Sequence, residues 1–246
     1  MRKIKVFLFL LAGFCCFNTA AFAQAQPTRV SPEDWLMKKG KELVSILSEE
    51  ETKTRYVKLR RIAKEVFHQK EMSRLAMGRY WRDFTPDQQA ALQYLFFDYF
   101  VVSYGTTSLG TADVNIKITE KQPSGRDILL KTQISVNFDG ALPKELPGKV
   151  SINNNAADNN TDNYFEILFA LREIPSGYYI RDAKVEGQSI LMFLRSQLES
   201  DLQAAGYDPN ALLDSMRQKI NLRYRAAEDM AKANSEKKQS AGATRL

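Results

Sequence analysis

The chain has 246 residues, with 35 Lys plus Arg against 29 Asp plus Glu, so its formal net charge at pH 7 is +6. The excess lies at the two ends, because three positive charges precede residue 6 and the segment 223–246 holds six basic and three acidic residues. The stretch 24–222 between them is neutral, whereas a nucleic-acid-binding domain needs a basic surface on its folded body. We therefore expect no nucleic-acid partner.

The first residues have the pattern of an export signal. Three basic residues precede an apolar run over 6–17, and Ala21-Phe22-Ala23 follows as a small-x-small cleavage site, which is typical of a secretory signal peptide. The run is shorter than the about 20 apolar residues of a membrane span. We predict a signal peptide over 1–23, cleavage after Ala23 and a periplasmic protein. Both cysteines, Cys15 and Cys16, fall in the removed segment, so the mature chain has no disulfide and no Cys-based metal site.

Helices are expected in the first part of the mature chain. Ser31 followed by Pro32 is a helix start, and a second apolar-periodic segment spans 56–67. A third helix starts at Thr85, where Gln88 completes a capping box in type. Apolar residues recur along one face of this third helix at helical spacing: Leu92, Leu95, Phe96, Tyr99, Phe100 and Tyr104.

The hydrophobic period changes from 3.6 to 2 in the middle of the chain. Alternating apolar residues occur at 114–118, over 127–138, at 165–171 and again from Gly177. Such alternation indicates a sheet with one wet face and one apolar face. We predict an α+β fold, in which a mostly antiparallel sheet of about four strands packs against helices.

The sequence indicates one domain with two irregular segments. Residues 24–222 suffice for a single core, interrupted by an Asn-rich stretch over 139–163 that we interpret as a long loop. The basic tail, 223–246, begins as a possible helix continuation and is expected to be largely disordered.

The search for catalytic groups finds little. His68 is the only histidine, and its place in a helical pattern favours a surface or capping role. Asp182 and Glu186 lie on one strand about 13 Å apart, which exceeds the spacing of a glycosidase pair. No phosphate loop, metal cluster or nucleophile elbow is present, so we expect neither an enzyme nor a cofactor.

Large apolar side chains are in excess on elements that we expect to face each other. The aromatic face of the third helix is predicted to look toward the apolar face of the sheet. A curved sheet capped by helices forms either a solid core or a cavity, and these patterns leave both possibilities open.

Two segments resemble a known family. They are "MGRYWRDFTPDQQAAL", 77–92, and "YYIRDAKVEGQSILMFLRSQL", 178–198. Both are similar to signature regions of the MlaC, or toluene-tolerance, family of periplasmic phospholipid-binding proteins. The matching residues are Gly78, Arg79, Trp81, Arg82, Thr85, Pro86 and Gln88 in the first segment, and Ile180, Asp182, Glu186, Gly187, Ser189, Arg195 and Ser196 in the second. Tyr178 and Gln188 depart from the pattern, replacing a usual Trp and a usual aliphatic residue.

The resemblance implies an NTF2-like curved sheet with added helices around an apolar cavity. It implies a soluble carrier that holds glycerophospholipid acyl chains and shuttles lipid between an outer-membrane lipoprotein complex and an inner-membrane ABC transporter. A hopanoid or other apolar ligand, or a scaffold or chaperone without ligand, stays open as an alternative. The candidate lipid-binding residues are Phe96, Tyr99, Phe100, Tyr104, Ile134, Val136, Phe165, Ile167, Phe169, Tyr178, Ile180, Leu191 and Leu194.

Local roles are also expected around the second segment. Gly187 permits a sharp turn from strand to helix, and Ser189 is placed to cap that helix. Asp182 and Glu186 are expected to pair with Arg79, Arg82 or Arg195.

Overall fold

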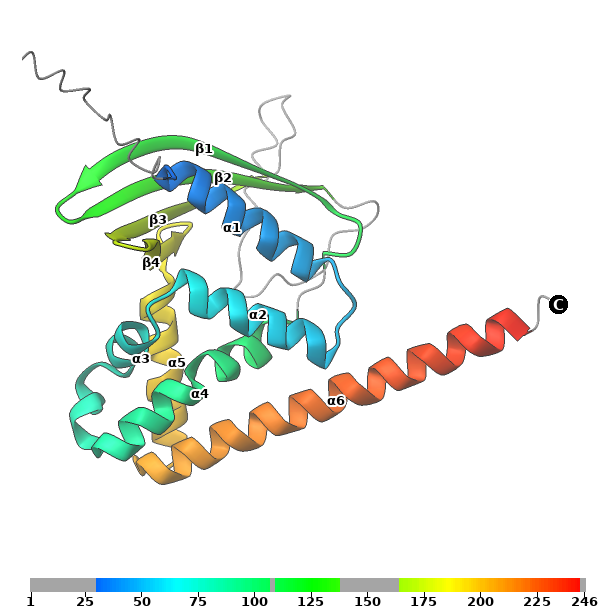
Figure 1. Ribbon diagram of the computed structural model, residues 1–246. Coiled ribbons are helices and arrows are strands. Elements are labelled where there is room, and N and C mark those ends of the chain that lie inside the picture. Colours follow the sequence, from blue (N-terminus) through cyan, green and yellow to red (C-terminus); the bar gives the residue numbers. More distant parts are fainter. Residues whose placement is uncertain (1–29, 107–108, 138–163, 244–246) are drawn as a thin grey trace, which may run out of the picture.

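The computed structural model describes residues 30–106, 109–137 and 164–243 (Figure 1). The predicted signal peptide and the predicted Asn-rich loop both lie outside these ranges. The helices of the described residues are α1 (Pro32–Leu47), α2 (Lys53–Val66), α3 (Gln69–Met77), the 3-10 helix η1 (Gly78–Asp83), α4 (Pro86–Tyr104), α5 (Ile190–Ala204) and α6 (Pro209–Ala243). The strands are β1 (Asp113–Ser124), β2 (Asp127–Asn137), β3 (Tyr164–Ile174), β4 (Gly177–Val185) and β5 (Gln188–Ser189).

Side-chain caps begin the helices where the sequence places them. Ser31 accepts a hydrogen bond from the backbone N–H of Asp34 at the start of α1. At α4, the Thr85 hydroxyl and the Gln88 side chain bond each other's backbone N–H groups, so the predicted capping box is confirmed. These bonds satisfy N–H groups that have no partner within the first turn of a helix.

The five strands form one antiparallel sheet in the order β1-β2-β3-β4-β5. The register places Ile134 of β2 between Ile116 of β1 and Phe165 of β3, so the alternating apolar residues share one face. Figure 1 shows this sheet curving over the helices, and the predicted α+β fold is confirmed. The sequence predicted about four strands, and the structure has a fifth. This additional strand, β5, has 2 residues and pairs with the end of β4.

A tight turn joins β4 to β5 and leads directly into α5. Glu186 and Gly187 both have positive φ, 48° and 79°, as a two-residue hairpin turn requires. Ser189 then accepts from the N–H of Met192, which confirms the predicted cap. The turn and the cap explain how a strand gives way to a helix within a few residues.

The two carboxylates near this turn do not have the expected partners. Asp182 accepts from the backbone N–H of Leu191 at 3.1 Å, and Glu186 accepts from the N–H of Glu166 at 2.8 Å. The prediction that they pair with arginines is wrong. The first turn of α5 and the start of β3 leave backbone N–H groups beside these side chains, and the two carboxylates accept from them.

The helices form a layer below the sheet, with α1 lying across the sheet itself (Figure 1). Within the helical layer α4 packs chiefly against α6, α2 and α3. The Tyr99 hydroxyl bonds Asp201 of α5, and the Tyr104 hydroxyl donates to Gln197 of α5 at 3.2 Å. The prediction that the aromatic face of this helix looks toward the sheet is therefore wrong, because the polar ends of its tyrosines find partners on α5.

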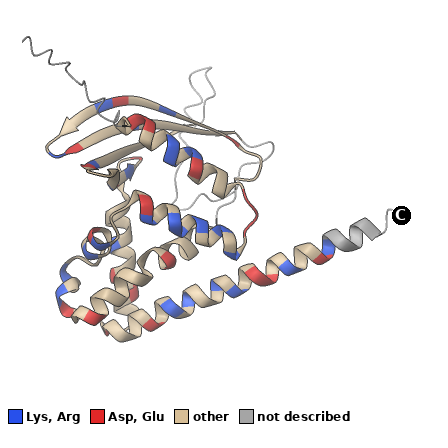
Figure 2. Cartoon of the chain, in the orientation of Figure 1, with Lys and Arg blue, Asp and Glu red and all other residues tan. Residues whose placement is uncertain are grey.

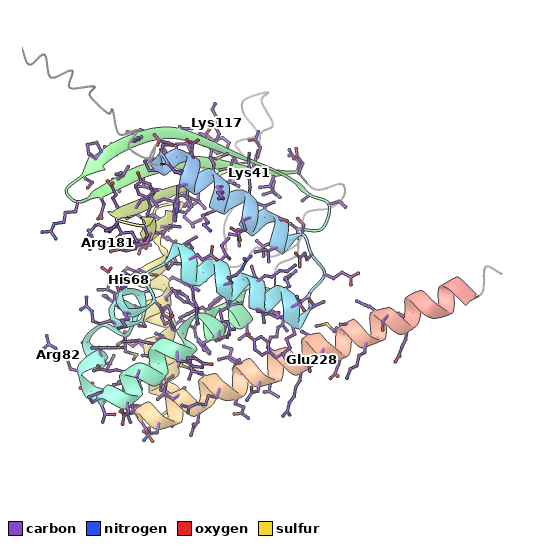
Figure 3. The ribbon with its side chains drawn as sticks, viewed as in Figure 1. Lys41, His68, Arg82, Lys117, Arg181 and Glu228 are labelled. Carbon is purple, nitrogen blue, oxygen red and sulfur yellow. The ribbon has the colours of Figure 1, made fainter. Side chains whose placement is uncertain are left out.

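The C-terminal tail is helical as far as Ala243, so the prediction of a largely disordered tail from residue 223 is wrong for the described part. Arg223 donates to the Tyr56 hydroxyl at 2.9 Å, and Ala227 is fully buried. Lys53 pairs with Glu228 at 2.7 Å, and Figure 3 labels Glu228 near the point where α6 leaves the body. Acidic and basic side chains are both spread along α6 (Figure 2). The net charge of the segment therefore did not reveal the side of the helix that packs against the body.

Candidate functional site

The inner face of the sheet is the side that looks toward α1 and the helical layer, and its burial changes along the strands. Leu130, Leu171 and Ala183 are 0 to 1% exposed and belong to the core. At the other end of the strands the apolar side chains are only half-buried and lie outside the core cluster formed by the described residues. We call this half-buried set the open end: Val114, Ile116, Ile134, Val136 and Phe165.

A row of three residues separates the core from the open end. Ile118, Thr132 and Ile167 lie side by side on β1, β2 and β3. Thr132 is fully buried, and its hydroxyl donates to the Ile167 carbonyl at 3.0 Å, so the polar group has a partner. Ile118 and Ile167 pack against the core. The apolar side chains of the inner face that lie outside the core therefore begin beyond this row.

Helix α1 covers the inner face beside the open end. A Cβ atom at Gly40 would lie 2.8 Å from Cδ1 of Ile116, so the helix backbone approaches β1 directly. Leu43 and Val44 follow on the same side of the helix at i+3 and i+4, and Leu43 is 39% exposed. We infer that α1 contributes apolar groups to one wall of the open end.

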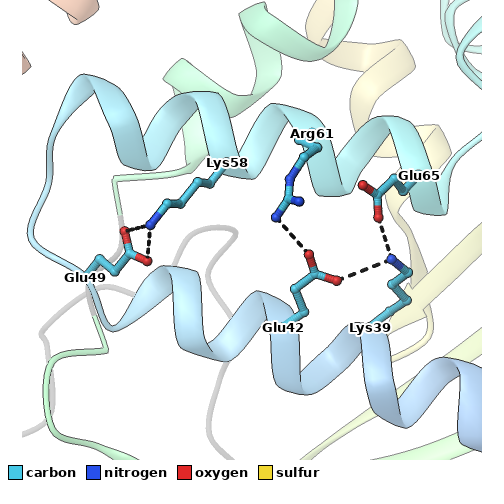
Figure 4. A network of polar contacts seen from close by, with 6 residues as sticks. All are labelled: Lys39, Glu42, Glu49, Lys58, Arg61 and Glu65. Carbon is cyan, nitrogen blue, oxygen red and sulfur yellow. Dashed lines mark hydrogen bonds and ion pairs between the residues drawn. The ribbon is translucent and has the colours of Figure 1, made fainter.

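Ion pairs attach α1 to α2 (Figure 4). Lys39 pairs with Glu65 at 2.5 Å, and Arg61 pairs with Glu42 at 3.0 Å. Just after α1 ends, Glu49 pairs with Lys58 of α2 at 2.6 Å. These pairs are partly exposed, so each adds little to stability, but together they fix the direction of α1 relative to the helical layer.

The predicted lipid-binding residues fall into separate parts of the molecule. Three of them, Ile134, Val136 and Phe165, belong to the open end, while Ile167 and Phe169 pack against the core. Their contact with lipid stays a prediction.

The helical members of the set lie elsewhere. Phe96 and Phe100 pack edge to face with ring centroids 4.8 Å apart, and both are buried in the helical layer together with Tyr99. Of the other helical members, Tyr104 is half-buried and stacks on Phe100. Leu191 is half-buried and Leu194 is buried.

The predicted set has two residues on β4, Tyr178 and Ile180, and both connect the sheet to the helices. Tyr178 meets Trp35 of α1 edge to face, with ring centroids 6.0 Å apart. Ile180 forms an isolated backbone bridge with Phe67, which follows α2. Both residues are buried, so the sheet and the helices do not converge on one cavity lined by all the predicted residues.

A pocket, the second candidate site, lies between the two signature segments. Its volume is about 260 Å³, and none of the predicted lipid-binding residues lines it. The lining residues are Met77, Gly78, Arg79, Tyr80, Arg195 and Glu199. Sequence reasoning identified Gly78, Arg79 and Arg195 as motif residues but did not bring them together, because the segments are far apart in the chain.

The geometry of this second site explains part of both motifs. Gly78 ends α3 with φ +59°, and a Cβ there would lie 3.2 Å from Nε of Arg195. Arg195 donates to the Leu75 carbonyl through Nε at 3.1 Å and Nη2 at 2.7 Å. The carbonyls in the last turn of a helix lack partners of their own, so Arg195 joins α5 to the end of α3.

The only histidine has a structural role. His68 is exposed and caps α3, because its Nδ1 accepts from the N–H of Glu71 at 3.3 Å. The predicted capping role is confirmed. Within the described ranges no cluster of three His, Cys, Asp or Glu side chains is suited to a metal ion. Among the same residues no helix has the length and apolar character needed to cross a bilayer.

One protein-family model matches part of the chain. The family model described as MlaC protein matches residues 38–141, a range that includes the first signature segment. The resemblance to the MlaC family is confirmed. The second MlaC-like segment, 178–198, lies outside the matched range. A search of curated proteins gives no match.

A solved structure supports the same fold. The phospholipid-binding protein from Ralstonia solanacearum, determined in complex with a phospholipid, is similar with a TM-score of 0.52 and 12% sequence identity. The similarity covers 76% of this chain and 96% of that one. At this identity the likeness establishes that the MlaC-like chain shares the fold.

Proposed function

We propose that this chain is a soluble periplasmic carrier that binds phospholipid and shuttles it between an outer-membrane lipoprotein complex and an inner-membrane ABC transporter. The observation that carries the proposal is the open end, where apolar side chains of three strands stay half-buried instead of joining the core. An apolar surface of this kind, beside a partly exposed Leu43, is suited to an acyl chain.

The energetics favour a carrier with such a surface. Transfer of one 16-carbon chain from a bilayer to water costs about 13 kcal/mol, at about 0.8 kcal/mol per methylene. A protein that takes lipid through water must replace most of that free energy with apolar contact. The headgroup loses hydration if it is buried, so we expect the chains to lie against Ile134 and Phe165 while the headgroup stays in water.

The similar Ralstonia protein was solved with a bound phospholipid, which supports the same ligand class for this chain. The chemistry of the described residues also supports binding over catalysis. His68, the only imidazole in the sequence, is engaged as a helix cap. Replacing His68 by Ala is expected to leave lipid content unchanged, whereas an enzyme that used it would lose turnover.

The ligand is identified by extraction. Protein purified from the periplasm is extracted with organic solvent, and the extract is analysed by mass spectrometry. We expect glycerophospholipid with varied headgroups, in a constant ratio to protein. A hopanoid would place the chain among carriers of another apolar ligand, and an extract without any lipid would favour a scaffold or chaperone.

Shuttling is tested by transfer between membranes. Donor vesicles with fluorescent phospholipid are mixed with unlabelled acceptor vesicles, and the protein is expected to raise the transfer rate in proportion to its concentration. The export part of the proposal has its own measurement, because the mature chain should begin at Gln24. A periplasmic protein that retains residues 1–23 would contradict it.

A further inference from the structure

Two arginines line the pocket between the signature segments, and two more lie close to it in the sequence. Arg79 and Arg195 line it, while Arg74 and Arg82 flank it along the chain and are exposed. Figure 3 shows Arg82 projecting from η1, at the opposite end of the molecule from Lys41 and Lys117. Three acidic residues stand against these four arginines: Glu199 in the lining, Asp83 next to Arg82, and Asp208 next to Tyr207, whose ring contacts Tyr80. The arginines therefore outnumber these acids, whereas the stretch 24–222 as a whole is neutral.

The floor of the pocket is fixed before any partner arrives. Arg195 is held by its two bonds to the Leu75 carbonyl and lies against Gly78. Its remaining nitrogen, Nη1, has no hydrogen bond to any residue that the structure describes. On the other side, the Gln89 amide donates to the carbonyls of Trp81 and Phe84 at 3.0 and 3.1 Å, which anchors η1. A site held in this way loses little conformational entropy on binding.

The rim of the pocket can exchange partners. Arg79 bonds Glu199 at 2.8 Å, but their side chains are 76% and 42% exposed. Solvent screening weakens an ion pair with such exposure, so another carboxylate can replace Glu199 at low cost. Arg79 lies over the Tyr80 ring at 4.7 Å, and Tyr80 in turn contacts the exposed ring of Tyr207. Arg and Tyr are the residue types enriched in the interfaces between proteins.

The size and charge of the pocket decide what it holds. Its volume of 260 Å³ is below the about 300–1,000 Å³ of small-molecule sites and suits a single side chain. Each exposed arginine contributes little alone, so binding requires a ligand that meets several of them at once. We propose that this pocket docks an acidic segment of a partner protein, with one carboxylate between Arg79 and Arg195 and neighbouring acids on Arg74 and Arg82.

This proposal goes beyond the carrier function and is independent of it. No residue of the open end takes part, so a partner can hold the chain here while lipid occupies the sheet. Docking and lipid binding are accordingly separate measurements, and failure of one leaves the other standing.

The experiment uses a fluorescein-labelled octa-glutamate peptide as the probe and the full mature chain as the receptor, with fluorescence anisotropy at low ionic strength. We expect saturable binding that the double variant Arg79→Glu, Arg82→Glu weakens about tenfold. The matched control is Lys41→Glu, Lys117→Glu, which changes net charge equally at the far end of the molecule and should change affinity by less than about twofold. Glu199→Gln removes the competing carboxylate and should tighten binding.

Several results would overturn the proposal. Equal weakening in both double variants would mean that the peptide senses only net charge. Displacement by inorganic phosphate beyond that caused by sodium chloride of equal ionic strength would assign the pocket to a small oxyanion. Binding to phosphatidylglycerol vesicles that is lost in the Arg79→Glu, Arg82→Glu variant, without peptide binding by the parent chain, would assign it to a membrane. If that variant does not fold, Glu199→Gln decides, because unchanged or weaker binding contradicts the pocket.

Discussion

The buried carboxylate of Asp98 provides a quantitative test of how α6 is held to the body. Asp98 of α4 is 4% exposed and accepts from Arg60 of α2 at 3.1 Å and from the Tyr224 hydroxyl of α6 at 2.8 Å. Burial, followed by the hydrogen bond to Asp98, raises the pKa of Tyr224. The phenol is therefore a protonated donor at neutral pH.

Tyr224→Phe removes one donor from this carboxylate and leaves the ring in place. A hydrogen bond to a charged group contributes about 1.5–3 kcal/mol, and Arg60 still compensates the charge in the variant. We expect the free energy of unfolding to fall by about 2 kcal/mol, which lowers the midpoint of thermal unfolding by about 4–8 °C for a chain of this size.

The assay is urea unfolding followed by far-ultraviolet circular dichroism. Tyr94→Phe is the matched control, because Tyr94 lies on α4 but is 65% exposed, and its change should stay within about 0.5 kcal/mol. If Tyr224→Phe is as stable as the parent, α6 does not pack at this position. The disordered tail expected from sequence would then be the better description of residues 223 onward.

Three further substitutions test other contacts in the fold by the same unfolding assay. Gly78→Ala forces a side chain into positive φ beside Arg195 and should cost about 1–3 kcal/mol; an unchanged stability would contradict the contact between α3 and α5. Ser189→Ala removes the cap of α5 and should cost about 1 kcal/mol, and a neutral effect would show that Asp182 alone suffices. Partial burial acts to raise the pKa of Asp127, but hydrogen bonds from Arg172 and Arg181 outweigh it and the net pKa is lowered. The stability that Asp127 contributes is therefore present above the unfolded-state pKa of about 4 and is lost as the pH falls through the lower folded-state value. Asp127→Asn should be destabilised at pH 7 and approach the parent below about pH 4, and a deficit independent of pH would refute this.

The local elements of the fold could be predicted from sequence because their signals are local. The capping box at Thr85, the cap at Ser189 and the turn at Gly187 depend on residues within a few positions of one another. Strand alternation likewise identified the inner face. Side chains two residues apart share a face of a sheet, so the alternating apolar residues indicate which face is buried. The course of α6 was missed because its packing stripe crosses a segment whose composition resembles that of a disordered tail.

The candidate site could be predicted only in part, because it depends on how separate elements meet. The sequence identified Ile134, Val136 and Phe165 as apolar and inward-facing, but it could not show that Ile167 joins the core while Phe165 does not. The burial of Phe96 among the helices also follows from packing between distant segments. The pocket at Arg79 could not be predicted for the same reason, because its lining residues come from two segments that are far apart in the sequence.

The most direct test of the carrier account measures lipid phosphorus per protein in two variants of β2. Ile134→Glu places a carboxylate in the open end, and Ser135→Glu places the same group on the opposite face one residue later. A carboxylate on the acyl surface excludes the chains or loses its charge at a large cost. We predict a folded Ile134→Glu protein that copurifies with little phospholipid and a Ser135→Glu protein with the full amount. A folded Ile134→Glu protein that retains its full lipid content would contradict the assignment of the open end.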